Sequence, residues 1–102
     1  MNDILHERTI RLIGKQAMKI LMDKNVVLIG LGGVGSYVLE ALARAGIGNL
    51  VLVDYEKIEE SNINRQILAL HSTIGMLKTD AAYIRVKDIN PGINVEIHNI
   101  FV

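Results

Sequence analysis

Three glycines follow an apolar run in a spacing that is typical of phosphate-binding loops. Residues 26–29 lead into Gly30, Gly32 and Gly35, which form the pattern G-x-G-x-x-G. The first glycine permits a tight turn out of a strand, the second has no Cβ to keep a phosphate off the backbone, and the third lets a helix pack closely. Free N–H groups at the start of that helix can face an anion. The pattern therefore predicts a nucleotide-binding loop.

An acidic residue and two cations follow the loop. Asp54 stands about 20 positions after Gly35, at the end of the apolar run 50–53, where an acid can accept hydrogen bonds from ribose hydroxyls. Lys78 lies near the start of a predicted helix, where a cation opposes the helix dipole unless an anion sits beside it. Arg65 and Lys78 together favour a triphosphate as the ligand. Backbone N–H groups can bind a diphosphate without the help of two additional cations, whereas a triphosphate carries more charge.

Alternating helical and strand patterns would position these residues. Helices are expected at 3–13, 15–24, 34–45 and 77–89, and strands at 26–29, 50–53 and 93–97, with a polar loop at 55–72. These elements predict an α/β fold, a Rossmann-like parallel sheet of about three strands with helices on both faces, preceded by N-terminal helices. Residues 1–24 are the expected helical segment, and 25–102 are the expected partial Rossmann-like, nucleotide-binding domain. Only the first half of a doubly wound fold is present.

Composition narrows the possible functions. The chain has 102 residues, of which 50% are hydrophobic, so one small, well-buried domain is expected. Eleven basic and eleven acidic residues cancel, which gives the segment no broad attraction to nucleic acid or to an anionic membrane. Without cysteine there is no thiolate nucleophile and no cysteine-ligated zinc. His71 and His98 lack a second ligand at metal-binding spacing, so no metal-ligating residue is assigned. Neither a leader nor a membrane span is recognised, which makes the cytoplasm the default.

The motifs together resemble the ubiquitin-activating-like (ThiF/MoeB/HesA-type) family of ATP-dependent adenylyltransferases. The matching segments are the glycine loop 30–35, Asp54, the run S-N-I-N-R-Q at 61–66, Gly75 with Lys78, and I-N-P at 89–91. Within the family, G-I-G at 46–48, N-R-Q-I at 64–67 and R-L-I-G at 11–14 look most like the branch of tRNA threonylcarbamoyladenosine dehydratases. The resemblance covers only the N-terminal, nucleotide-binding part of such an enzyme.

The resemblance implies a role for each matching residue. The glycines would hold the ATP phosphates, namely Gly30, Gly32, Gly33 and Gly35. Asp54 would hold the ribose, while Asn62, Arg65 and Lys78 would hold the triphosphate, with Gln66 as a weaker supporting residue. Arg8 matches the arginine that reaches into the site of a partner subunit. ATP and Mg²⁺ are the implied cofactors, although the family's second magnesium-holding acid has no match within these residues.

The resemblance also implies a reaction and partners. A carboxylate would be adenylated, in the dehydratase branch the threonylcarbamoyl group on a tRNA adenosine, which then cyclises with loss of water. The tRNA would be a substrate of the full-length enzyme and would not be bound mainly by this segment. A homodimer and a sulfur-transfer protein are further implied partners, and the activity belongs to a ligase-like, tRNA-modifying enzyme.

Two other readings stay open. An NAD-binding Rossmann domain of an oxidoreductase shares the glycine pattern and Asp54, and a non-catalytic fragment or interaction module would explain why only half of the fold is present. A missing second half also leaves the strand at 26–29 with an unpaired apolar edge. The segment is therefore expected to self-associate or to dock on a partner.

Overall fold

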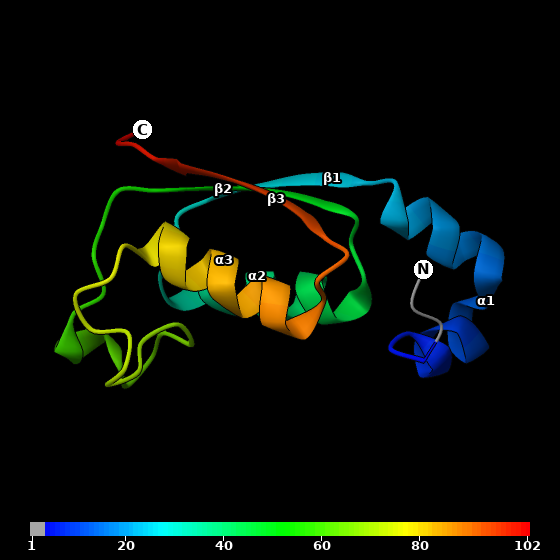
Figure 1. The fold of residues 1–102 in the computed structure, drawn as a ribbon, viewed down its shortest axis with the longest axis horizontal. Coiled ribbons are helices and arrows are strands. Elements are labelled where there is room, and N and C mark those ends of the chain that lie inside the picture. Colours follow the sequence, from blue (N-terminus) through cyan, green and yellow to red (C-terminus); the bar gives the residue numbers. More distant parts are fainter. Residues whose placement is uncertain (1–3) are drawn as a thin grey trace.

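The elements follow one another as helix, strand and crossover helix in a computed structural model that describes residues 4–102. They are α1 (Glu7–Met22), β1 (Asn25–Ile29), α2 (Gly33–Ala45), β2 (Asn49–Asp54), the 3₁₀ helix η1 (Glu60–Asn62), α3 (Lys78–Ile89) and β3 (Asn94–Asn99) (Figure 1). The helix expected from residue 3 begins partly outside the described residues.

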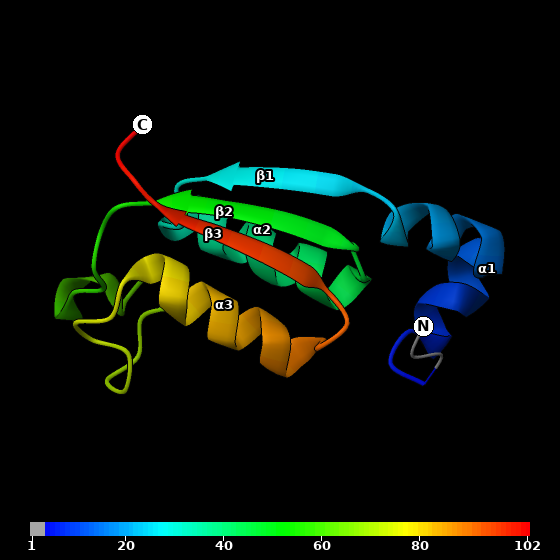
Figure 2. The same ribbon diagram turned by 45° about the horizontal axis from the view of Figure 1, so that its top comes forward.

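The three strands form one parallel sheet whose spatial order is the order of the chain. β2 lies in the middle, with Asn25 and Asn94 of the two outer strands both opposite Asn49. Because the strands are parallel, their carboxyl ends meet at one edge of the sheet, where Figure 2 shows the turn from β1 into α2. The predicted α/β, Rossmann-like half with three strands is confirmed.

Both crossover helices lie on the same face of the sheet, so the expected covering of both faces is wrong for the described residues. Figures 1 and 2 show α2 and α3 side by side beneath the strands, and the two helices pack against each other. Two right-handed crossovers that step in the same direction place their helices on one face, and the other face is covered only after the chain reverses direction. The core lies between this helix layer and the sheet, and it includes Leu39, Ala43, Leu50, Leu52 and Val86.

α1 extends away from the sheet and is interrupted at Gly14. That glycine has φ 86° and ψ 161°, so the element consists of two helical segments, as the sequence predicts. Met18 is fully buried, whereas Leu12 on the other side of the bend is exposed. No helix among residues 4–102 is long and apolar enough to cross a membrane.

The uncovered face of the sheet is apolar on β1 and β2 and polar on β3. Val27 and Ile29 of β1 are 57% and 65% exposed, and they lie opposite Val51 and Val53 of β2. On β3 the same face carries the ion pair between His98 Nε2 and Glu96 Oε2, 3.2 Å apart. Val53 is buried and Val51 is half-buried, so the exposed apolar side chains of this face lie mainly on β1. They lie next to the edge of β1 that pairs with no strand in the described part of the chain.

We expect the 102-residue segment, expressed alone, to self-associate through this face. Covering about 400 Å² would contribute about 10 kcal/mol at about 25 cal/mol per Å², before association costs of similar size. Val27→Lys should shift the segment toward monomer in sedimentation at micromolar concentration, because a charged edge opposes pairing. Glu96→Lys, on the polar strand of the same face, is the control. A compact, cooperatively unfolding wild-type monomer would contradict the prediction.

Candidate functional site

The glycine loop joins β1 to α2 at the carboxyl edge of the sheet. Gly30 has φ 93°, a conformation that favours glycine, and its N–H donates to Val53 O at 2.8 Å. A Cβ on Gly35 would lie 2.0 Å from Gly30 O, so the turn and the helix touch through their backbones. Gly32 precedes the first turn of α2, whose N–H groups have no partner within the helix. The loop thus combines close packing with donors suited to an anion.

Asp54 fixes the glycine loop to β2. The residue is 7% exposed, and its Oδ2 accepts the Leu31 N–H at 2.7 Å while its Oδ1 accepts the Glu56 N–H at 2.8 Å. Each carboxylate oxygen has a second lone pair. Asp54 can therefore still accept a hydrogen bond from a ribose hydroxyl, and that contact stays a prediction. The hydrogen bond from the Leu31 N–H, which ties the glycine loop to β2, is a structural finding.

The segment after β2 carries the expected amide residues, and it contains η1. Asn62 is buried, and its Oδ1 accepts the Glu59 N–H at 2.9 Å in a capping box, so this side chain holds the turn in shape. Gln66 is 8% exposed, and its Nε2 would lie 3.8 Å from a Cβ on Gly32. Its buried Oε1 accepts no hydrogen bond within the described residues. Gln66 therefore lies against the glycine loop with one acceptor unused.

The two expected cations differ in their surroundings. Arg65 is exposed, and its Nη1 donates to Ser61 O at 2.9 Å and to Asn64 Oδ1 at 3.1 Å. Lys78 is the first residue of α3, and its side chain is only 4% exposed. Its Nζ lies 3.2 Å from Glu56 Oε1. One cation is thus available at the surface, and the other is buried with an acidic partner.

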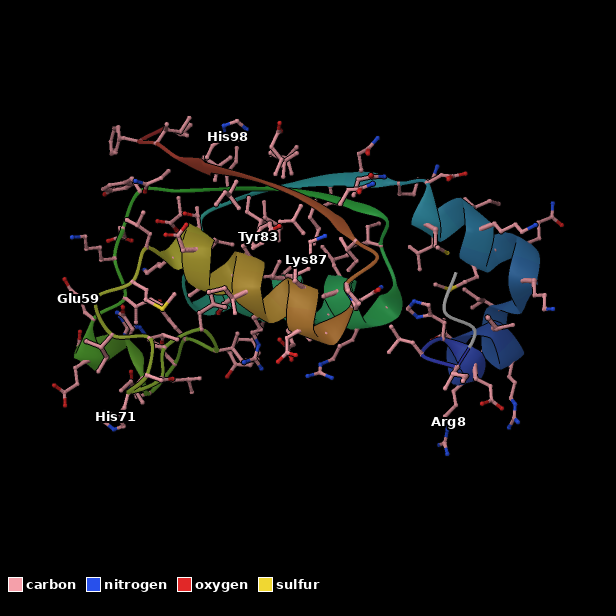
Figure 3. The ribbon with its side chains drawn as sticks, in the orientation of Figure 1. Arg8, Glu59, His71, Tyr83, Lys87 and His98 are labelled. Carbon is pink, nitrogen blue, oxygen red and sulfur yellow. The ribbon has the colours of Figure 1, made fainter. Side chains whose placement is uncertain are left out.

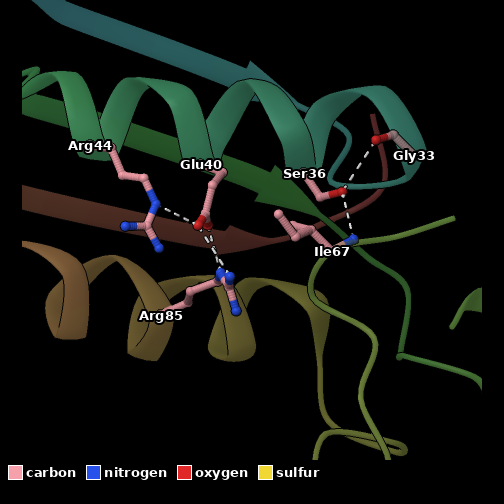
Figure 4. A network of polar contacts seen from close by, with 6 residues as sticks. All are labelled: Gly33, Ser36, Glu40, Arg44, Ile67 and Arg85. Atoms are coloured by element: carbon pink, nitrogen blue, oxygen red, sulfur yellow. Dashed lines mark hydrogen bonds and ion pairs between the residues drawn. The ribbon is translucent and has the colours of Figure 1, made fainter.

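Ser36 connects the glycine loop to the 62–67 segment, a role that was not predicted from the sequence. Its Oγ donates to Gly33 O at 3.3 Å and accepts the Ile67 N–H at 3.3 Å (Figure 4). A Cβ on Gly33 would lie 3.8 Å from Arg65 O, which shows how closely the two segments approach. A small hydroxyl residue directly after the third glycine was the available signal, because it can bond backbone groups in both directions.

An ion-pair network holds α2 and α3 together beside this junction (Figure 4). Glu40 accepts from Arg85 Nε at 2.6 Å and from Arg44 Nε at 2.7 Å. Hydrogen bonding to Arg85 lowers the pKa of Glu40 below its usual value, although burial acts in the opposite direction. Glu40 raises the pKa of Arg85 in return. The network fixes the helix layer and contains none of the expected site residues.

Arg8 does not join the other expected site residues. It is exposed on α1, and Figure 3 places it at the end of the molecule opposite Glu59 and His71. An arginine there lies far from the glycine loop of its own chain. The position is compatible with the expected reach into a partner subunit, which stays a prediction.

A small hollow lies at the carboxyl ends of β1 and β2. It measures about 150 Å³ and is lined by residues that include Gly30, Asp54, Tyr55 and Glu56. Pockets for drug-sized ligands are typically about 300 to 1,000 Å³. No group of three or more metal-ligating side chains occurs within residues 4–102. The hollow is therefore too small to enclose a nucleotide, and the described residues contain no complete metal site.

Comparison with known proteins agrees with this geometry. A model of the ThiF family matches residues 6–102. The chain belongs to the ThiF family. Curated relatives of this ThiF-family chain include the tRNA threonylcarbamoyladenosine dehydratases of Haemophilus influenzae, 48% identical over 90% of this chain, and of Bacillus subtilis, 47% identical over 78% of it. The matches cover 35% and 31% of those proteins, so the chain spans about a third of their length.

A solved structure extends the ThiF-family comparison to three dimensions. The crystal structure of Escherichia coli tRNA N6-threonylcarbamoyladenosine dehydratase in complex with ATP matches with a TM-score of 0.95 and 38% sequence identity. The match covers 98% of this chain and 41% of that one. The resemblance to the ubiquitin-activating-like family and to its dehydratase branch is confirmed.

Proposed function

We propose that this chain is the ATP-binding part of an enzyme that activates a carboxylate by adenylation. The observation that carries the proposal is the junction that Ser36 makes between the glycine loop and the segment bearing Gln66 and Arg65. It places backbone donors of the loop beside a segment that carries a cation, at the carboxyl edge of the sheet, where ligands of open α/β sheets bind. The similarity to an ATP-bound dehydratase supports the choice of nucleotide.

In this proposal each site residue acts on ATP. The backbone at Gly30, Gly32, Gly33 and Gly35 receives the phosphates. Asp54 holds the ribose, and Asn62, Arg65, Gln66 and Lys78 hold the triphosphate. A carboxylate oxygen of the substrate attacks the α-phosphorus and pyrophosphate leaves. Arg65 and Lys78 stabilise the charge that spreads over the phosphate oxygens, so no covalent residue is needed.

The proposed magnesium ion arrives with ATP. Asp54 is the acid nearest the glycine loop, but both of its oxygens already accept backbone N–H groups. Asp54 could therefore supply at most one oxygen ligand to Mg²⁺. The phosphate oxygens and an acid outside residues 4–102 would supply the remaining ligands, as hard oxygen donors suit Mg²⁺.

The proposed substrate is the threonylcarbamoyl group of a tRNA adenosine. Once adenylated, it cyclises and AMP leaves, so that the nucleoside loses one water overall. Its support is the name shared by the relatives above. Because acidic and basic residues balance in this chain, the tRNA would be bound mainly by another part of the enzyme. The enzyme would be a cytoplasmic dimer in which Arg8 reaches the partner's site. Incubating native-length protein with ATP and such a tRNA should remove one water per modified adenosine, as measured by mass spectrometry. An unchanged nucleoside mass would refute this substrate.

The protein at its native length should bind Mg-ATP more tightly than NAD in a calorimetric titration. Arg65 and Lys78 give a triphosphate two cations beyond the backbone donors, whereas the diphosphate of NAD gains less from them. AMP is the control ligand, since it shares adenine and ribose but lacks the outer phosphates. Tighter binding of NAD would favour the oxidoreductase reading, and binding of no nucleotide would favour an interaction module.

A further inference from the structure

Lys78 is a buried cation whose partner is an acid at the surface. The lysine side chain is 4% exposed, whereas the side chain of Glu56 is 55% exposed. A buried ammonium group needs a counter-charge, since an unpaired charge away from water is costly. The carboxylate of Glu56, with Oε1 3.2 Å from Nζ, supplies that counter-charge in this structure.

The backbone of Glu56 is fixed on both sides, which leaves its side chain as the movable part. Its N–H donates to Asp54 Oδ1 at 2.8 Å, and its carbonyl oxygen accepts the Lys78 N–H at 3.0 Å. Glu56 also lines the hollow that contains Gly30 and Asp54. Glu56 thus pairs with Lys78 and also borders the space next to Gly30 and Asp54.

A triphosphate and the Glu56 carboxylate would compete for the same ammonium group. Phosphate oxygens can neutralise Lys78 as well as a carboxylate can, and they carry more charge. A carboxylate left beside a polyphosphate would repel it. Because half of the Glu56 side chain is in solvent, the carboxylate can turn outward without losing hydration.

We propose that Glu56 holds the place of the triphosphate on Lys78 while the site is empty and releases the lysine when ATP binds. Glu56 is then a positioning residue that keeps a buried cation compensated and preset for its ligand. The inference rests on the proposed function, because it takes the competing ligand to be the triphosphate.

Glu56→Gln tests the exchange in native-length protein. The variant removes the competing charge and keeps the shape, so Mg-ATP should bind about tenfold more tightly in calorimetry, while AMP affinity stays unchanged. Without nucleotide the melting temperature should fall, and saturating ATP should restore it to the wild-type value. Glu60→Gln removes one acid from the same segment, and it should change neither quantity. Glu56→Asp keeps the charge and should bind ATP with nearly wild-type affinity.

The outcomes separate this inference from the proposed function. If wild-type protein binds ATP and Glu56→Gln binds it equally or more weakly, the exchange is refuted while the proposed function stands. If neither protein binds ATP, the proposed function fails. Should Glu56→Gln not fold without nucleotide, Glu56→Ser offers a second neutral variant in which the same tightening must appear, and ATP affinity at or below that of wild type would again refute the exchange.

Discussion

Gly35→Ala should destabilise the protein more than any other single-methyl change in the glycine loop. The new Cβ would lie 2.0 Å from Gly30 O and 3.0 Å from Gly30 C, both of them backbone atoms. The strand-to-helix turn cannot yield as a flexible side chain could, so we expect a loss of at least about 3 kcal/mol in the free energy of unfolding. Urea unfolding of native-length protein measures it through the transition midpoint.

Gly33→Ala is the matched control for this expectation. A Cβ on Gly33 would have no neighbour closer than Arg65 O at 3.8 Å, and the residue does not have a positive φ. The free energy of unfolding of the Gly33→Ala variant should therefore stay within about 0.5 kcal/mol of the wild-type value, as for most substitutions that disturb no packed or strained position. ATP binding should weaken nonetheless if a phosphate approaches that backbone. Equal stability of the two variants would contradict the close packing at Gly35.

Removing either of the two cations that we propose to bind the triphosphate should slow adenylation far more than it affects folding. Arg65→Ala and Lys78→Met should each reduce kcat/KM by about 30- to 1,000-fold, which corresponds to about 2 to 4 kcal/mol of transition-state stabilisation. Methionine fills the buried space of the Lys78 stem, so the loss can be assigned to the charge. The rate of pyrophosphate release in native-length protein is the measurement.

Two comparisons protect this assignment. Lys57→Met removes an exposed cation from the same segment and should leave the rate of pyrophosphate release unchanged. Asp54→Ala should act mainly on nucleotide affinity and on stability, because the carboxylate holds the Leu31 N–H at 2.7 Å. Unchanged pyrophosphate release in both cation variants would rule out their placement on the triphosphate.

Local patterns were sufficient to predict the strands and the α-helices, whereas η1 lies in the segment that was expected to be a loop. The apolar runs that lead into Gly30 and Asp54 became β1 and β2, and the 3.6-residue period around Ala82 and Val86 became α3. Such runs need only neighbouring residues to be recognised. The unpaired edge expected for the strand at 26–29 agrees with the place of β1 at the side of the sheet, next to β2.

Partners distant in sequence could not be predicted in this way. The position of Lys78 pointed to an anion, but Glu56 lies 22 residues away and meets it only because the chain folds back through the bridge between Lys57 and Leu77. The same limit applies to Ser36, which bonds Ile67 across 31 residues. Asn62 shows a different limit. Its amide caps the turn that contains it, and the sequence alone does not distinguish such an asparagine from one that binds a ligand.

The strand order has a consequence for the time at which each part of the sheet forms. Because β1, β2 and β3 lie side by side in the order of synthesis, each strand can pair with its predecessor as soon as it leaves the ribosome. The sheet then grows by addition of β2 to β1 and of β3 to β2. The strand that carries Val27 and Ile29 is synthesised first and forms the opposite edge of the sheet. Among the three strands, this edge is therefore exposed for the longest time during translation, and a chaperone bound there would protect the nascent chain from aggregation.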